Sequence, residues 1–322
     1  MISKQKKFLF GLLLTVSYSQ EVKWMSIGDL HNWYSAAGCE IEVGRTGQVS
    51  DQQDGLRYPA FYRVQDNQAA KGLWLGAANF HDPVVNKDYE YKVVHAGPRH
   101  LDIENETIPV EMTMDGKYDH PNVFVDGDPA TNLQYLDNVN NVDPSLPSDR
   151  RINNIVQTSI GVQMKRTIYA FSHPEHQNYH IQEYVFTNNG CFDKDCTTNY
   201  EQTLEGFQVY LQYRYAISRE GMVYDGGWLP QSAAWGHNTM NDVIGEHPDA
   251  PSNNDQYYDD GEVIRGLFSW QGYHSDASFD NIGGPNAPGE GHLGAAQFVG
   301  IVTLHADTSP SDNADDINQP ST

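Results

Sequence analysis

Residues 207–215 read FQVYLQYRY, and this stretch is the most informative about the fold. Phe207, Val209, Leu211, Tyr213 and Tyr215 alternate with Gln208, Tyr210, Gln212 and Arg214. Successive side chains of a β-strand point to opposite faces, so this alternation predicts a half-buried strand with one apolar face.

Two further β-rich runs lie upstream, at 164–171 and 179–187, on either side of HPEHQN. Proline and asparagine favour turns, so the connector predicts a hairpin that reverses near Pro174. Shorter apolar runs predict strands at 73–77, 91–94, 263–270 and 298–304.

Helical patterns are scarce. Apolar spacing at 24–37 is interrupted by Gly28 and Ser35, and 137–147 is broken by Asp, Asn and Pro. Two long stretches rich in Gly, Asn, Asp and Pro, at 221–260 and 271–294, are typical of loops. Short strands separated by turns predict an all-β fold: an antiparallel β-sandwich with long decorated loops and little helix.

The first nineteen residues are typical of a secretory signal peptide. Lys4, Lys6 and Lys7 precede the apolar run 8–16, and Ser17 and Ser19 are small residues suited to cleavage before Gln20. We therefore expect export to the exterior or the cell surface, with 1–19 removed. The expected β-rich domain covers 20–307, with a subdivision near 137–150 or an inter-strand loop there. The segment 308–322 is then an acidic, proline-ending linker or a truncated end.

Acidic residues dominate the charge. The chain has 43 Asp and Glu against 20 Lys and Arg, a net charge of −23, which disfavours nucleic acid as a partner. No apolar run in the mature chain is long enough to span a bilayer. Asp126, Asp128 and Asn132 surround a turn at Gly127 and would supply oxygen ligands for calcium as a cofactor. Solubility conferred by surface carboxylates is the alternative.

Cysteine and histidine suggest two local features. Cys191 and Cys196 lie five residues apart in a polar stretch, so they would form a disulfide that closes a small loop in an oxidising compartment. Cys39 would then remain unpaired. His173, His176 and His180 lie around the predicted turn and would supply imidazole ligands for a metal. The alternative is three solvated histidines.

Catalytic signatures are missing from the sequence: it contains neither a G-x-S-x-G nucleophile elbow nor a phosphate-binding glycine motif. A glycosidase needs two facing carboxylates, and the many acids leave that pair unidentified. Glu183 lies between Ile181 and Val185, which suggests a buried carboxylate. We expect that a buried Glu183 carboxylate would form a structural ion pair with Arg166 on the neighbouring strand rather than act in catalysis.

Aromatic residues in or beside the long loops provide the remaining functional signal. They are Trp228, Trp235, Trp270 and Tyr273. Aromatic rings beside Asn and Asp suit the apolar faces and hydroxyl edges of sugars. The alternative is that these rings cap the core beneath the loops.

Several segments resemble large secreted proteins of environmental bacteria, many of which end in a type IX-type sorting domain. They are AAKGLWLGAANF at 69–80, VVHAGPR at 93–99, the run 159–190 and AAQFVGIVTLHAD at 295–307. The resemblance implies secretion and a β-rich fold, and it implies no activity or site residues. The chain stops at Thr322 without such a sorting domain, so we expect it to be the N-terminal part of a longer protein.

Together these features predict a secreted or cell-surface, non-enzymatic protein that acts by binding or as a structural component. A glycan or another surface protein is the expected partner. The alternative is an extracellular carbohydrate-active hydrolase that uses paired carboxylates.

Overall fold

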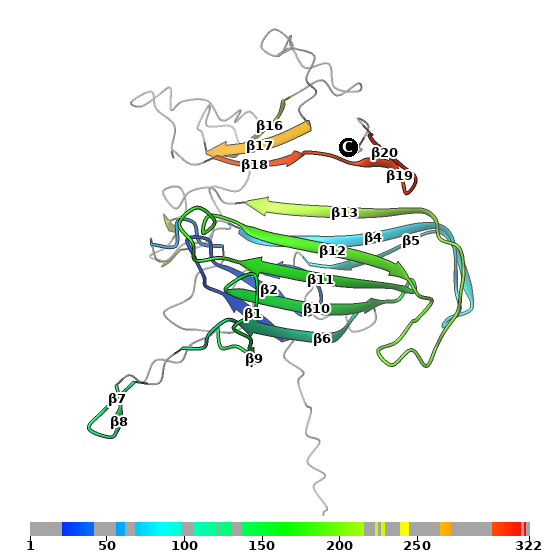
Figure 1. Cartoon of the computed structure of the whole chain (residues 1–322). Coiled ribbons are helices and arrows are strands. Elements are labelled where there is room, and N and C mark those ends of the chain that lie inside the picture. The colour runs from blue at the N-terminus through cyan, green and yellow to red at the C-terminus, as the bar shows by residue number, and fades with distance from the viewer. Residues whose placement is uncertain are drawn as a thin grey trace, which may run out of the picture.

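The structure, a computed structural model, consists of β-strands joined by turns and loops (Figure 1). It describes residues 21–41, 56–61, 68–97, 106–120, 123–130, 137–215, 223–224, 227–228, 239–244, 265–271, 298–316 and 319. The strands are β1 (Val22–Met25), β2 (Asn32–Ser35), β3 (Glu40–Ile41), β4 (Gln68–Asp82), β5 (Lys87–Ala96), β6 (Thr107–Gly116), β7 (Phe124–Val125), β8 (Asp128–Pro129), β9 (Asn141–Val142), β10 (Arg150–Thr158), β11 (Val162–Ala170), β12 (His180–Asn188), β13 (Glu205–Tyr215), β14 (Val223–Tyr224), β15 (Gly227–Trp228), β16 (Thr239–Ile244), β17 (Arg265–Gln271), β18 (Phe298–Thr303), β19 (Asp307–Ser309) and β20 (Asp312–Asp315).

The first large sheet is built around β4. Its strand order is β1-β2-β3-β4-β13, and β5 also pairs with β4. β13 runs antiparallel along one edge of β4. On the other edge, β3 pairs with Lys71 and Ala70, and β5 pairs with the part from Leu73 to Asp82. This long strand therefore receives three partners.

The second large sheet has the order β12-β11-β10-β6-β9. Its neighbours are antiparallel except β6 and β9, which are parallel over two residue pairs. The stretch 137–150 is an inter-strand connection that carries β9 and buries Leu146. The predicted hairpin is confirmed, since β11 pairs with β12 across the turn.

Apolar side chains from the two large sheets pack together in two buried clusters. Leu73 and Leu75 of β4 pack with Val156 and Met164 of the second sheet, and β1 and β2 pack with β6, β10 and β11 in a second cluster. In Figure 1 the second sheet lies in front of β4 and β5. The all-β fold is confirmed, and the described part contains no helix. The finer description as a sandwich stays a prediction that this packing supports.

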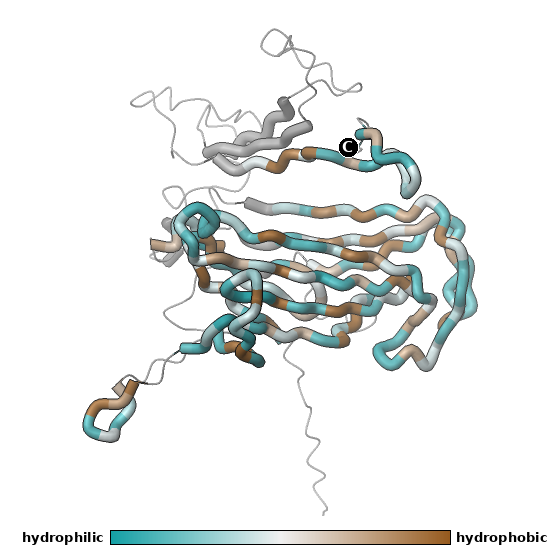
Figure 2. The backbone as a smooth tube through the Cα atoms, in the orientation of Figure 1, coloured by the Kyte–Doolittle hydropathy of each residue, from teal (hydrophilic) through white to brown (hydrophobic). Residues whose placement is uncertain are grey.

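Hydrophobic and hydrophilic positions alternate along the strands of the large sheets (Figure 2). The strand predicted at 207–215 is confirmed as β13, and those at 298–304 and 263–270 correspond to β18 and β17. The runs at 73–77 and 91–94 lie within the longer strands β4 and β5. Within the described ranges, no helix has the length and apolarity needed to cross a bilayer.

One ambiguous stretch is resolved, and two predictions need refinement. The interrupted helical pattern at 24–37 is a β-hairpin, because Gly28, with φ at +78°, lies in the connection that reverses the chain between β1 and β2. The stretch predicted as a loop at 221–260 contains β14, β15 and β16. The acidic tail is not wholly an extended linker, since β19 and β20 pair there.

Candidate ligand-binding face

Three aromatic side chains lie on neighbouring strands of the first sheet. Trp74 of β4 is directly opposite His95 of β5 and, on its other side, Tyr210 of β13. Alternation places all three side chains on the face turned away from the core, because Leu73 and Leu75 flank Trp74 and point inward. We name these three residues the aromatic row.

The rings of the aromatic row are in contact. The Trp74 ring centroid is 5.4 Å from that of His95, in a tilted arrangement, and 5.7 Å from that of Tyr210, in an edge-on arrangement. Such centroid distances are favourable for aromatic pairs. The cross-strand pairs therefore hold the three rings together across the sheet.

Polar partners fix two of the three rings. The Trp74 indole N–H donates to the Gly97 carbonyl oxygen at 3.3 Å. The His95 Nδ1 lies 2.8 Å from a Glu106 carboxylate oxygen, which also accepts the His95 backbone N–H at 3.1 Å. Both rings are half-buried, whereas Tyr210 is 55% exposed. Tyr210 is thus the part of the row most available to a ligand.

Small residues border the aromatic row along β4. Gly76 and Ala78 continue the outward face, so the strand carries little side-chain bulk beyond Trp74. The neighbouring positions on this face are Val93, opposite Gly76, and Tyr91, opposite Ala78, and both side chains are exposed. Exposed Gln208 pairs with Gly76 from the other side and offers an amide. The outward face of the first sheet thus combines aromatic rings, the Gln208 amide and a stretch of β4 with small side chains.

The aromatic face ends where β4 changes phase. Asn79 has φ of +48°, a left-handed conformation that asparagine tolerates better than most residues. Before Asn79 the odd-numbered residues of β4 are buried, whereas after Asn79 the even-numbered residues Phe80 and Asp82 are buried. This reversal sends the next side chains into the core.

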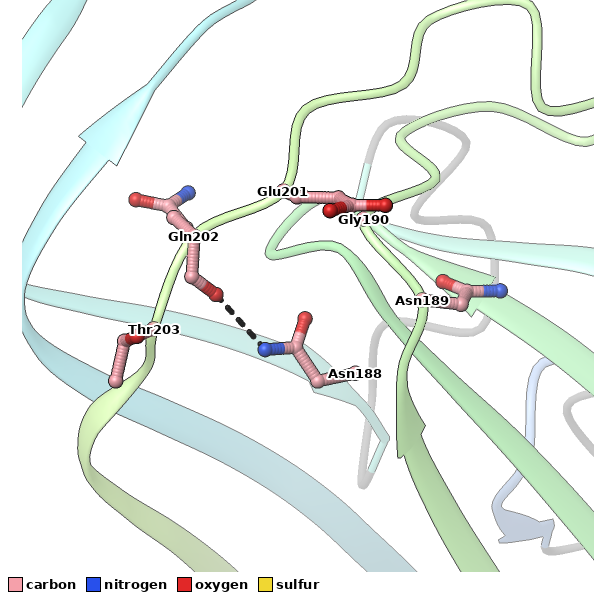
Figure 3. Close-up of a pocket in the computed structure, with 6 residues that line it drawn as sticks. All are labelled: Asn188, Asn189, Gly190, Glu201, Gln202 and Thr203. Carbon is pink, nitrogen blue, oxygen red and sulfur yellow. Dashed lines mark hydrogen bonds between the residues drawn. The ribbon is translucent and has the colours of Figure 1, made fainter.

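A separate hollow of about 390 Å³ lies where the chain returns from β12 to β13 (Figure 3). We name it the amide cup; its lining residues are Asn188, Asn189, Gly190, Glu201, Gln202 and Thr203. It is open to solvent and mainly polar, and Glu201 supplies the only carboxylate of its lining.

Most amides of the cup serve the loop itself. Asn188 Nδ2 donates to the Gln202 carbonyl at 2.8 Å, and Gln202 Nε2 donates to the His81 carbonyl at 2.9 Å. Asn189 exchanges hydrogen bonds with the buried Gln157 side chain. Since these groups already have partners, the amide cup offers less to a ligand than the aromatic row.

The loop beside the amide cup is closed by a disulfide. Cys191 and Cys196 are bonded, with their Cα atoms 4.8 Å apart. The Asp193 carboxylate accepts hydrogen bonds from the Thr197 hydroxyl and from the backbone N–H groups of Thr197 and Thr198, which hold its pKa well below the usual range. Cys39 is a free, buried thiol, and burial raises its pKa to about 11, so it is unreactive.

The structure separates the three histidines predicted to bind a metal. His173 and His176 lie together on the exposed turn with Glu175, which the sequence did not single out. His180 instead points into the protein, where its Nδ1 is 2.8 Å from the Tyr34 hydroxyl. Burial lowers the pKa of His180 to about 4 against the opposing effect of the Glu40 carboxylate. The side chains that lie close enough together to bind one metal ion are therefore those of His173, Glu175 and His176.

The predicted calcium ligands lie at a hairpin turn. Asp126 and Gly127 join β7 to β8 with φ values of +53° and +90°, as in the two-residue turns that asparagine or aspartate and glycine favour. Asp126 and Asp128 are exposed, and Asn132 lies outside the described residues. The Asp-Gly sequence thus has a structural explanation, while calcium binding stays a prediction.

The four loop aromatics are only partly placed. Trp228 lies in β15, and Trp270 lies in β17, opposite Met240 and Phe298. Trp235 and Tyr273 lie outside the described residues. Their proposed contact with a glycan stays a prediction.

The suggestion that Glu183 is buried is wrong. On β12, Ile181, Glu183 and Val185 all face outward and are exposed, whereas Gln182, Tyr184 and Phe186 are half-buried. Arg166 is fully buried and donates to the Gly38, Cys39 and Ser35 carbonyls and to Asn154 Oδ1. No Glu183–Arg166 ion pair forms, because the two side chains occupy opposite faces.

Sequence reasoning missed the aromatic row. Trp74, His95 and Tyr210 are far apart in the chain, and only the pairing of three strands brings them together. The available signal is Gly72 and Gly76 on either side of Trp74 in KGLWLGAA, since glycine inside a strand often marks a place where a ligand or another backbone approaches closely. No known family, curated protein or solved structure matches the chain.

Proposed function

We propose that the chain is a secreted or cell-surface, non-enzymatic protein whose aromatic row binds glycans. The observation that carries the proposal is the contact of Trp74 with His95 and Tyr210 on the outer face of the first sheet. Sugar rings have apolar C–H faces that pack on aromatic rings, and their hydroxyls need polar partners. The exposed amide of Gln208 lies on the same face and supplies one.

The rigidity of the row supports this proposal. Trp74 is tied to Gly97, and His95 is tied to Glu106, so a ligand meets two rings that are already positioned. Binding then loses little side-chain freedom, which favours affinity. Secretion is supported by the signal-peptide pattern at 1–19 and by the acidic composition.

The alternative is hydrolysis of a glycan by two carboxylates. A glycosidase places such a pair about 5–10 Å apart, with one group free to act as an acid. At the aromatic row, one carboxylate oxygen of Glu106 contacts both His95 Nδ1 and the His95 backbone N–H, so this carboxylate positions a ring. The geometry here favours binding over hydrolysis.

The test is to incubate the purified chain with a panel of insoluble polysaccharides. Loss of protein from solution and release of reducing ends are measured together. We expect depletion by at least one polysaccharide without new reducing ends. New reducing ends, or no depletion by any polysaccharide, would contradict the proposal.

Substitutions at the row make the test specific. Tyr210→Ala removes the most exposed ring, and we expect roughly three- to tenfold weaker retention, in line with the worth of an aromatic contact. Phe124→Ala is the matched control, because Phe124 is 60% exposed on the β7–β8 hairpin. Equal retention of the two variants would show that the row is not the binding face.

A further inference from the structure

The turn between β11 and β12 brings two imidazoles and a carboxylate together at the surface. His173, Pro174, Glu175 and His176 form the turn, in which the His176 N–H donates to the His173 carbonyl at 2.8 Å. This is the first-to-fourth bond of a β-turn, and Pro174 presets the backbone angle at the second position. We name residues 173–176 the histidine turn.

The turn geometry sets the distances between the side chains. The ring centroids of His173 and His176 are 5.5 Å apart. One potential ligand atom from each of His173, Glu175 and His176 lies within 4.8 Å of the others. Zinc ligands at about 2.1 Å from the ion lie roughly 3.4 Å from one another in a tetrahedron. All three side chains are exposed, and rotation about the side-chain bonds of His173 and Glu175 closes this gap without moving the backbone.

A tyrosine supports one of the two imidazoles. The Tyr179 hydroxyl lies 2.6 Å from His176 Nδ1, which leaves Nε2 to face an ion. Histidines that bind metals usually hold a hydrogen bond through the second nitrogen, which fixes the ring and its tautomer. Phe171 packs against both His176 and Tyr179 and limits their movement. His176 is therefore held in position.

The His173 imidazole loses only one hydrogen bond when it binds a metal ion. His173 Nδ1 accepts the Glu175 backbone N–H at 3.2 Å on the exposed surface. A metal ion on His173 replaces this single long hydrogen bond, and water can satisfy the released N–H. The local cost of binding is small.

We propose that the histidine turn binds a zinc-class divalent metal ion through His173, Glu175 and His176, with water in the open position. Two imidazoles with one carboxylate match the preference of zinc, whereas calcium takes six to eight oxygen ligands. The net charge of −23 raises the local concentration of cations around the protein. This site is independent of the aromatic row.

The test is calorimetric titration of Zn²⁺ into the metal-free chain, with and without excess Ca²⁺. We expect one zinc per chain and no competition by calcium. His173→Ala, Glu175→Gln and His176→Ala should each weaken binding about tenfold or more. These residues are exposed, so the melting temperature without zinc should not change. Failure of the parent chain to bind zinc would overturn the proposal.

Two further variants separate a built site from general surface binding. Tyr179→Phe removes only the hydroxyl that positions His176, and we expect roughly tenfold weaker binding with one zinc still bound. His305→Ala is the matched control, because His305 is an exposed histidine outside the turn, paired with Asp307. Zinc affinity that falls equally in His305→Ala, or stays unchanged in the double variant His173→Ala/His176→Ala, would refute the assignment.

Discussion

Glu40 and Lys71 form an ion pair of 3.0 Å in the protein interior, with 4% and 8% of their side chains exposed. Asn32 and Gln182 also donate to Glu40, at 2.6 and 3.0 Å. Burial alone would lower the pKa of Lys71, but the Glu40 carboxylate outweighs it and holds that pKa well above its usual value. Because Gln182 belongs to β12, this pair also links the first sheet to the second.

Glu40→Ala should lower the free energy of unfolding by about 3–5 kcal/mol, because it leaves the Lys71 ammonium buried without its counter-charge. The double variant Glu40→Leu/Lys71→Leu should lose less, since no charge stays buried. Urea denaturation of the single and double variants measures the difference. Glu21→Ala, which removes the partner of Lys23 nearer the surface, is the control and should change stability by about 1 kcal/mol or less. A double variant less stable than Glu40→Ala would contradict this account.

Arg166→Lys should also be destabilising. The guanidinium donates to three backbone carbonyls around residues 35–39 and to Asn154, so it holds the turn between β2 and β3 against the second sheet. An ammonium group cannot reproduce this planar set of donors, and we expect a loss of about 2–3 kcal/mol. Lys165→Ala on the adjacent, exposed position should change stability by less than about 0.5 kcal/mol. Thermal unfolding of both variants tests this; equal melting temperatures would disprove it.

The alternation in 207–215 predicts β13 as a strand, although only Phe207 of its apolar face packs against the core cluster and Val209 and Leu211 are exposed. β2, by contrast, is buried at all four positions, so it shows no alternation. β10 carries Arg150, Asn154 and Gln157 as buried polar residues, which disrupts the apolar pattern. Partners of these groups lie far away in the chain, as with Asn154 and the Ala36 carbonyl. Local patterns cannot show such contacts.

The candidate sites show the same limit. On β12 both faces carry apolar residues, so the sequence could not decide whether Glu183 or Gln182 points inward. HPEH identifies two imidazoles of the histidine turn, because proximity within a turn is local. His180 does not belong to this turn, because β12 begins at that residue and its side chain points toward Tyr34.

Stability should fall as the pH is lowered from about 6.5 to about 4. Burial, assisted for His31 by the Arg57 cation, lowers the pKa of His31 and His180 to about 4, although Asp29, Asp137 and Glu40 oppose it. The unfolded chain takes up protons on both residues near pH 6.5, whereas the folded chain does so only near pH 4. Protonation therefore favours the unfolded state in this window.

Urea denaturation at pH 7.5, 6, 5 and 4.5 measures this effect. The double variant His31→Asn/His180→Gln should show a shallower loss of stability across the window, because its side chains do not titrate. Carboxylates elsewhere titrate equally in both proteins, so the difference between the two curves isolates the histidines. Parallel curves would contradict the proposed role of these two residues.

The loop beside the amide cup is constrained twice, which predicts a non-additive response. Cys191→Ser/Cys196→Ser opens a loop of six residues and should cost at most about 2 kcal/mol. The cost should fall below that limit because the Asp193 carboxylate still ties the loop to Thr197 and Thr198. Asp193→Ala alone should likewise be mild while the disulfide remains.

Removing both constraints should cost more than the sum of the separate losses, since each one limits the loop when the other is gone. A double-mutant cycle with the cysteine pair as one change and Asp193→Ala as the other measures this coupling by urea denaturation. Asp195→Ala in the same loop is the control, because the Asp195 side chain is exposed. Additive losses would mean that the disulfide and Asp193 constrain different movements, so that neither substitutes for the other in holding the loop beside the amide cup.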